Sequence, residues 1–302
     1  MDIVVRAAPG LERLLLEEVN DRVLTHREGL YFLRGKECPL WAQNIWLEPK
    51  RLEFSSIGEA VKHLRGIQRN WWFHSTGHHR RGALIQEQLP RILNKPVAFP
   101  TALPTLPMGA FTLESANQMI YSPSCTHPFP DGELQFVENK LGPPSRAYLK
   151  LWEILTLLGK APGPGDRVLD LGSSPGGWTW VLDQLGAEVL SVDKAPLAPQ
   201  IMASPRVKFI EESAFALEPE ALGPIDWLFS DVICYPERLL QLVEKWRRAG
   251  TVKNFVCTIK FQEPTNHQVA SQFLAIPGSQ VRHLCANKHE LTWSLLEADS
   301  NC

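Results

Sequence analysis

The sequence lacks the segments that would direct a protein to a membrane or out of the cell. It has no run of about 18 consecutive apolar residues, so no membrane-spanning helix is expected. The opening residues, Met1–Arg6, have no basic segment followed by a long apolar stretch, which argues against a secretory signal. The six cysteines are scattered, and none forms a Cys-x-x-Cys pair. Scattered thiols are typical of a reducing compartment, so we expect a cytoplasmic protein.

The sequence also lacks an excess of charge of either sign. Lys and Arg together number 31, Asp and Glu number 33, and the formal net charge is −2. Such a balance provides no general attraction to a nucleic acid, so any binding to RNA would depend on local basic patches. The 302 residues, 44% of them hydrophobic, suffice for about two domains whose cores need no disulfide or structural metal.

Three regions follow one another along the chain. Residues 1–125 read as a small α/β region, with a strand at 2–6, a helix at 11–19 and a second strand at 29–33. This beginning fits a ferredoxin-like or similar RNA-binding fold, and it equally fits a generic α/β cap. Residues 126–144 are rich in proline and small polar residues and read as a linker. A third region, 145–302, alternates helices and strands.

Basic and aromatic residues alternate between positions 65 and 81. They are Arg65, Arg69, Trp71, Trp72, His74, His78, His79, Arg80 and Arg81. Such a mixture can contact phosphates and stack on unpaired bases, which would make it an RNA-binding surface. The other interpretation places the two tryptophans in the core and the basic residues on a solvated turn. No further ligand lies at a spacing that would make a metal site of His78 and His79, and we expect no metal.

The pattern from residue 145 onward predicts a parallel, doubly wound sheet. Short buried strands are expected at 167–171, 189–192, 207–210, 227–229 and 255–259, and helices at 149–158, 178–185 and 239–246. Alternation of this kind is typical of parallel sheets covered by helices on both faces. The segments 281–285 and 291–296 are expected to close the sheet as an antiparallel hairpin.

A glycine-rich turn follows the first of these strands. The segment from Val168 to Trp178 reads as a buried strand, a turn containing Gly172, Gly176 and Gly177, and the start of a helix. Glycine lets the backbone approach a ligand closely, and ligands of open α/β sheets bind beyond the carboxyl ends of the strands. Asp193 ends the next strand, where a carboxylate can accept both hydroxyls of a nucleoside ribose. The turn lacks the G-x-G-x-x-G spacing of dinucleotide-binding folds, which argues against an NAD site.

The string Asp170-Leu171-Gly172-x-x-Pro175-Gly176-Gly177-Trp178 resembles the first motif of the FtsJ-like ribose 2′-O-methyltransferases, and the resemblance extends from about Ser145 to Leu296. It is closest to the bacterial 23S rRNA cytidine ribose methyltransferases, which carry an N-terminal THUMP-containing region. The resemblance implies an α/β fold: a Rossmann-like class I methyltransferase sheet behind a small N-terminal α/β RNA-binding domain, here shorter than in that group. It implies S-adenosyl-L-methionine as cofactor, with binding residues Gly172, Ser174, Pro175, Gly176, Gly177, Trp178, Asp193, Ser213 and Asp231.

The same resemblance implies a catalytic tetrad of two lysines and two acids. Matched by motif, they are Lys150, Asp231, Lys260 and Glu290. A ribose hydroxyl must lose its proton as it attacks the methyl group, and a lysine can accept that proton only if its pKa falls well below about 10.4. A second cation and partial desolvation both lower a lysine pKa. We therefore hypothesise that Lys260 is the base, that Lys150 is the neighbouring cation, and that Asp231 and Glu290 orient them.

Two positions depart from the family pattern. The third strand ends Glu211-Glu212-Ser213, where relatives often have an aspartate toward the adenine, so either glutamate could replace Ser213 there. Ala147 stands where the most similar group has a serine. The expected function is methylation of an RNA ribose, with ribosomal RNA as the expected partner. The alternatives are another RNA such as tRNA, a hemolysin-like relative, a small-molecule methyltransferase, and a non-catalytic RNA-binding module.

Overall fold

The computed structural model describes residues 1–92, 94–262 and 265–298, and the chain folds into two compact units. The first unit spans Met1–Phe136, and the second begins at Val137. Residues 126–136, which the sequence assigned to a linker, are bound into the first unit. There Gln43 Nε2 donates a hydrogen bond to the carbonyl of Gly132 at 2.6 Å. No helix within the described ranges is long and apolar enough to cross a bilayer.

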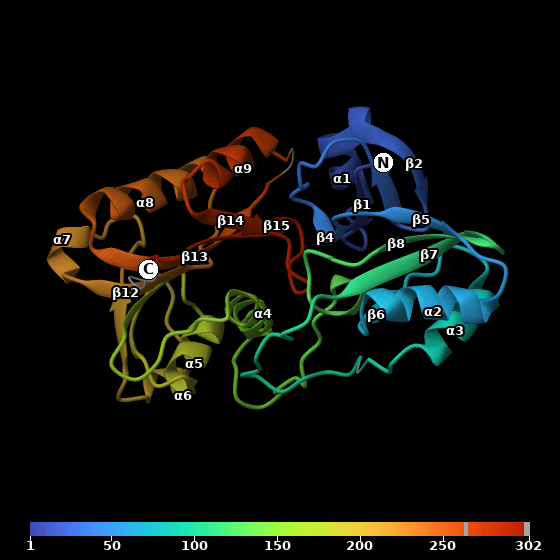
Figure 1. The fold of residues 1–302 in the computed structure, drawn as a ribbon. Helices are drawn as coiled ribbons and strands as arrows, with labels where there is room; N and C mark the ends of the chain where they lie inside the picture. Colours follow the sequence, from blue (N-terminus) through green and yellow to red (C-terminus); the bar gives the residue numbers. More distant parts are fainter. Residues whose placement is uncertain (93, 263–264, 299–302) are drawn as a thin grey trace. The chain divides into compact units, whose positions relative to one another are not determined.

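The first unit contains two four-stranded sheets with helices beside them (Figure 1). One sheet has the order β2 (Val23–Arg27), β3 (Leu30–Leu33), β1 (Ile3–Ala7) and β4 (Ala42–Trp46). The other has the order β5 (Lys50–Glu53), β8 (Gln118–Ser122), β7 (Gly109–Ser115) and β6 (Trp71–Phe73). The helices are α1 (Glu12–Val19), α2 (Ile57–Ile67) and α3 (His79–Gln88), with single 3-10 turns at Asn20–Arg22 and Pro130–Gly132. Apolar side chains of both sheets, among them Phe32, Trp46 and Ile120, share one core.

The predicted strand–helix–strand beginning is confirmed as β1, α1 and β3, but the sequence missed β2 between them. Four of the five residues of β2 are exposed, so it has no alternation of apolar and polar residues to mark it. The loop of residues 34–41 joins β3 directly to β4, where a ferredoxin-like unit would have its second helix. The first unit is therefore an α/β region that only partly follows the ferredoxin-like pattern.

The mixed segment 65–81 does not form one continuous stacking surface. Trp71 is fully buried, and its ring N–H donates to the carbonyls of Leu64 and Gln68. Trp72 donates its ring N–H to the Asp131 carboxylate at 3.0 Å, and His74 lies 2.8 Å from the same group. Trp71 thus belongs to the core, as the second of our two interpretations held, whereas Trp72 is only half-buried.

The second unit is the predicted doubly wound sheet. Its seven strands lie in the order β11 (Val207–Glu211), β10 (Glu188–Asp193), β9 (Arg167–Leu171), β12 (Ile225–Ser230), β13 (Val252–Lys260), β15 (Glu290–Leu295) and β14 (Ser279–Arg282). The first five are parallel, and β15 pairs antiparallel with both β13 and β14, which confirms the closing hairpin.

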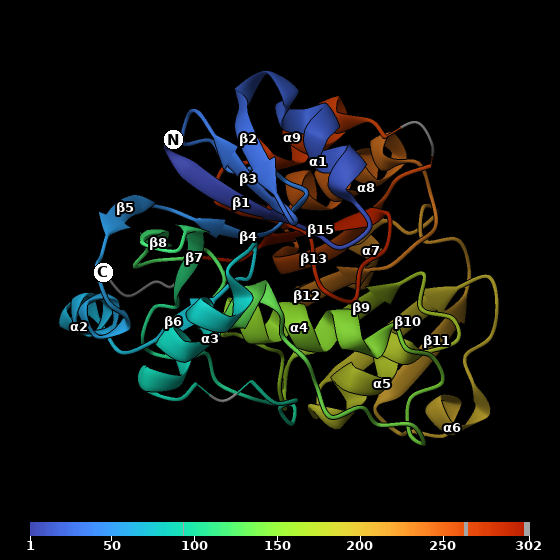
Figure 2. The ribbon, with the colours of Figure 1, turned by 90° about the vertical axis from the view of Figure 1, so that its right-hand side faces the viewer.

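Helices cover both faces of this sheet (Figures 1 and 2). On one face lie α4 (Tyr148–Leu158), α5 (Gly177–Gln184) and α6 (Pro199–Met202). On the other lie α8 (Pro236–Ala249) and α9 (His267–Leu274), and α7 (Pro219–Leu222) contacts α8. The chain runs outward from β9 to β11 and returns to place β12 beside β9, so the strand order reverses between β9 and β12. Ligands of open α/β sheets bind at such a reversal.

Candidate active site

The glycine turn after β9 lies at this reversal and closely approaches the neighbouring strand end. Gly172 has φ of +74°, and a Cβ atom there would lie 2.6 Å from the Cα of Val232. Gly177 begins α5, and a Cβ atom on it would lie 2.5 Å from Ser145 Oγ. Position 172 therefore needs glycine because of its conformation and its backbone contact, whereas a Cβ atom at position 177 would require the Ser145 hydroxyl to move.

The Asp193 carboxylate is held against this turn by backbone groups. Its Oδ2 atom accepts a hydrogen bond from the N–H of Ser174, and its Oδ1 atom accepts one from the N–H of Ala195, both at 3.0 Å. The side chain is half-buried at the end of β10. A carboxylate fixed in this way, with its remaining lone pairs toward a pocket, is well placed to accept hydrogen bonds from a ligand.

The turn, Asp193 and two of the tetrad residues line one pocket of about 500 Å³ in the second unit. Its volume falls within the range of about 300–1,000 Å³ that is usual for small-molecule sites. The predicted residues in its wall are Gly172, Ser174, Pro175, Gly177, Trp178, Asp193, Ser213, Asp231 and Lys260. Gly176 is the one predicted cofactor residue that is not in the wall. Of the acidic candidates after β11, Glu212 lines the pocket and Glu211 does not.

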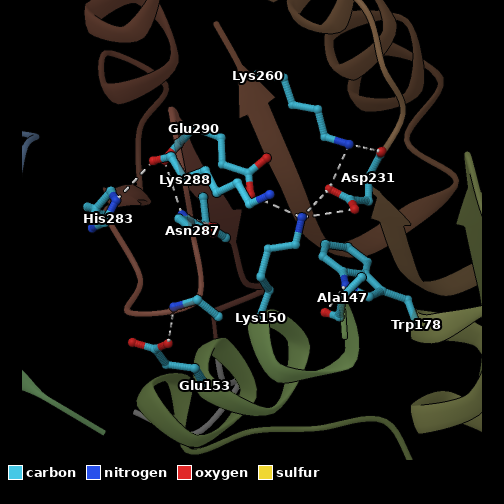
Figure 3. Close-up of polar contacts among 12 residues, drawn as sticks. Ala147, Lys150, Glu153, Trp178, Asp231, Lys260, His283, Asn287, Lys288 and Glu290 are labelled. Atoms are coloured by element: carbon cyan, nitrogen blue, oxygen red, sulfur yellow. Dashed lines mark hydrogen bonds and ion pairs between the residues drawn. The ribbon is translucent and has the colours of Figure 1, made fainter. Parts of the chain in front are cut away.

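Two carboxylates and two lysines meet beside the pocket, as Figure 3 shows. The amine of Lys150 lies 2.8 and 2.9 Å from the two carboxylate oxygens of Asp231 and 3.1 Å from Glu290 Oε1. The amine of Lys260 donates to the backbone carbonyl of Asp231 at 2.5 Å and lies 3.2 Å from its Oδ1 atom. Asp231 therefore joins the two lysines, and the Glu290 carboxylate forms an ion pair with Lys150.

The sheet explains why residues so far apart in the sequence come together. Asp231 directly follows β12, and Lys260 is the last residue of the adjacent parallel strand β13. Glu290 is the first residue of β15, which runs the other way, so the register pairs it with Lys260. Lys150 comes from the first turn of α4, which packs over this edge.

Lys150 is held as a cation. Burial by itself lowers the pKa of Lys150, but the charges of Asp231 and Glu290 together outweigh burial and raise the pKa above its ordinary value. Its side chain is only 9% exposed, and its amine lies 5.9 Å from the centre of the Trp178 ring. Lys260 is more open, with a 20% exposed side chain, and it reaches the pocket wall.

Two buried acids near the tetrad had no role in the sequence-based prediction: Asp170, which begins the glycine-turn motif, and Glu153, which was not named. Asp170 is fully buried in β9, and the Thr179 hydroxyl donates a hydrogen bond to its carboxylate at 2.6 Å. That hydrogen bond lowers the pKa of Asp170, but burial outweighs it and raises the pKa to about 7. Glu153 lies one turn after Lys150 in α4 and accepts a hydrogen bond from the N–H of Cys285 at 2.9 Å (Figure 3). Burial raises the pKa of Glu153 to about 7. An acid on the apolar face of a predicted helix was the available signal for Glu153.

The Ala147 position keeps a role through its backbone. Its carbonyl accepts a hydrogen bond from the Trp178 ring N–H at 2.9 Å, which ties the start of α4 to the glycine turn. Both residues line the pocket.

The comparison with known families agrees with this geometry. The model of the FtsJ-like methyltransferase family matches residues 143–283, which is most of the second unit and ends before β15. The second unit belongs to the FtsJ-like methyltransferase family. Its sheet is the Rossmann-like sheet of a class I methyltransferase. The glycine turn, Asp231 and Lys260 lie at the carboxyl ends of its parallel strands.

Curated relatives share this part of the chain. Ribosomal RNA large subunit methyltransferase M of Halorhodospira halophila is 37% identical over 120 residues, which cover 39% of this chain and 35% of the relative. The protein of the same name from Xanthomonas campestris pv. campestris is 33% identical over 210 residues, which cover 67% of this chain and 56% of the relative. The matches thus span about a third to just over half of the length of these relatives.

Among solved structures, a putative hemolysin from Lactococcus lactis superposes with a TM-score of 0.42 and 21% identity, covering 52% of this chain and 89% of that one. Methyltransferases of the FtsJ-like family use S-adenosylmethionine as the methyl donor.

Proposed function

We propose that this protein transfers a methyl group from S-adenosylmethionine to the 2′-hydroxyl of an RNA ribose, with ribosomal RNA as the substrate. The observation that carries the proposal is that Lys260 and Asp231 line the same pocket as the glycine turn. A site for the methyl donor and a candidate base are therefore adjacent. An rRNA substrate is suggested by the names of the relatives, and it would require a cytoplasmic protein.

The pocket residues fit S-adenosylmethionine. Asp193 can accept hydrogen bonds from ribose hydroxyls, and Ser213 and Glu212, which line the same pocket, are the candidates to contact the purine ring. The hydroxyls of Ser145 and Ser173 are buried in the pocket wall and have no hydrogen-bond partner among the described residues. Buried hydroxyls normally form a hydrogen bond, so these two are available to a bound ligand. When bound, the cofactor supplies a methyl group that its sulfonium already activates.

In this proposal the two lysines have different roles. Lys150 is kept charged by two carboxylates, so it cannot take a proton, and it holds Asp231 and Glu290 in place. Lys260, as a neutral amine, would accept the proton of the ribose hydroxyl, while the methyl group passes to that oxygen as its bond to sulfur breaks and S-adenosylhomocysteine is left. Its hydrogen bond to the Asp231 carbonyl fixes the direction of the amine. Fixed orientation of this kind supplies much of the rate in a transfer between two bound groups.

A methylation assay on ribosomal RNA tests the assignment, preceded by mapping of ribose methylation in cells with and without the protein. Lys260→Ala should lose methyl transfer while still binding S-adenosylmethionine. Lys260→Arg is the matched variant, because it keeps the charge but cannot act as a base. Full activity of either variant would remove Lys260 from the role of base.

The mapping also separates the alternatives. Methylation lost from tRNA would replace ribosomal RNA as the substrate. Binding of S-adenosylmethionine with no RNA ribose losing methylation would favour a non-catalytic module or a small-molecule methyltransferase.

A further inference from the structure

Two large apolar side chains project into solvent beside the pocket of the FtsJ-like unit. Ile233 is 80% exposed and Tyr235 is 61% exposed, and both lie in the short segment between Asp231 and the start of α8. Ile233 is also part of the pocket wall. Single exposed apolar residues are common, but two that lie two positions apart, one of them in the wall of a ligand pocket, suggest a surface that binds a partner.

These side chains lie on either side of a bend in the backbone at Cys234. Along the segment, Cys234 and Pro236 are buried while Ile233 and Tyr235 are exposed. We call the two exposed side chains the 233/235 ridge.

The ridge is held on a rigid backbone. At one end, Val232 packs against Gly172 so closely that no Cβ atom fits between them. At the other end, the carbonyl of Tyr235 accepts hydrogen bonds from the N–H groups of Arg238 and Leu239, at 3.0 and 3.2 Å, and caps α8. A side chain presented in this way loses little freedom on binding, and tyrosine offers a large contact area with few rotatable bonds.

The chemistry around the ridge indicates what it binds. Lys194, Arg238 and Lys260 lie in the adjoining pocket wall together with acids that include Asp193, Glu212 and Asp231, and the Arg238 guanidinium lies 3.8 Å above the Phe215 ring. Cations beside an exposed aromatic ring are the combination that binds single-stranded nucleic acid, where phosphates meet the charges and bases stack on the ring. The ridge begins two residues after Asp231, so a nucleotide whose ribose reaches Lys260 would bring a base within its reach.

We propose that the 233/235 ridge is a stacking platform for an unpaired base of the RNA substrate at the entrance of the active site. The proposal rests on the proposed function, because it assigns a base-binding surface to the nucleotide that presents its 2′-hydroxyl to Lys260. The ridge would hold the RNA strand open at the target and so favour loops and bulges over paired helices.

Methylation kinetics on the mapped rRNA fragment test the platform. Tyr235→Ala should raise the KM for RNA by about 5- to 150-fold, the range that the loss of one base–aromatic stack gives. It should leave the affinity for S-adenosylmethionine unchanged, because Tyr235 is outside the described pocket wall. Tyr235→Phe and Tyr235→Trp keep a ring and should stay near the wild-type KM. Leu274→Ala removes a 47% exposed side chain away from the pocket and is the control for a general loss of apolar surface.

RNA fragments that lack one base at a time identify the contact. For one abasic position, at the target nucleotide or next to it, Tyr235→Ala and wild type should have the same KM. An unchanged KM of Tyr235→Ala on the intact fragment, or the same penalty with every abasic fragment, would overturn the platform. Inactivity of the wild-type protein on every RNA would overturn the proposed function instead, so the two failures are distinguishable.

Discussion

Glu153 should make the stability of the FtsJ-like unit depend on pH in the range near neutrality. Burial raises the pKa of its carboxyl group from 4.5 to about 7, against the hydrogen bonds from the N–H groups of Cys285 and Ala286. Between these two pH values the folded protein holds a proton that the unfolded chain has released. The folded state therefore binds more protons, and the free energy of unfolding must fall as pH rises through this interval.

The size of the effect follows from the same two pKa values. At about 1.4 kcal/mol for each pH unit, a rise from 4.5 to about 7 costs about 3 kcal/mol once the group is ionised in both states. Part of this decrease in the free energy of unfolding has already occurred at about pH 5.5. The further decrease between about pH 5.5 and about pH 8.5 is therefore about 2 kcal/mol. This is a large part of the stability of an ordinary domain.

Urea unfolding of the full chain at these two pH values, for wild type and Glu153→Gln, provides the measurement. Glutamine keeps an oxygen to accept the N–H of Cys285 but carries no charge, so the variant should lack this part of the pH dependence. Asp170, whose pKa burial also raises to about 7, is present in both proteins and cancels in the difference. Glu220→Gln changes an exposed acid on α7 and should behave as wild type. Identical pH dependence of wild type and Glu153→Gln would refute the reasoning.

Three further changes test the site. Gly172→Ala should abolish S-adenosylmethionine binding in calorimetry, because φ is +74° and the new methyl group would lie 2.6 Å from the Cα of Val232. The control Gly66→Ala, where a Cβ atom has nothing within 4 Å, should bind S-adenosylmethionine normally. Normal binding by both variants would contradict the prediction. Lys150→Met should lower the free energy of unfolding by about 3–5 kcal/mol, because the carboxylates of Asp231 and Glu290 lose their shared cation. Adding Glu290→Gln should recover part of this loss, because it removes the repulsion between the two carboxylates. A double variant no more stable than Lys150→Met would argue against that repulsion. Trp178→Phe should lose about 1 kcal/mol in urea unfolding through its missing hydrogen bond, and equal stability would show that the bond contributes nothing.

The sequence predicted the second unit well because its signals are local. The buried strand, the glycine turn and the following helix are adjacent in the chain, and the structure has them as β9, residues 172–176 and α5. The strand ends that carry Asp231 and Lys260 could be located for the same reason. The resemblance to a family supplied Glu290, which a pattern of residues alone would leave as the start of a hairpin strand.

Features that depend on distant contacts could not be predicted. Glu153 contacts the N–H of Cys285, 132 residues later, and no local pattern announces that bond. In the first unit, the hairpin of β7 and β8 could not be predicted, because the turn at residues 116 and 117 carries no glycine or proline to mark it. Trp71 and Trp72 could belong to a surface or to a core, and only the packing of the first unit decides between them.

The direction of β15 limits how this part of the chain can change its length. Because β15 runs opposite to β13, the site receives its glutamate from the beginning of a strand, and the preceding residues 283–289 set which side chain arrives there. Loss of one residue from that connection would place Leu291 opposite Lys260 and turn every following side chain to the other face of the sheet. Lys150 would then face an apolar group, so this connection should resist insertions and deletions that surface loops elsewhere in the unit tolerate.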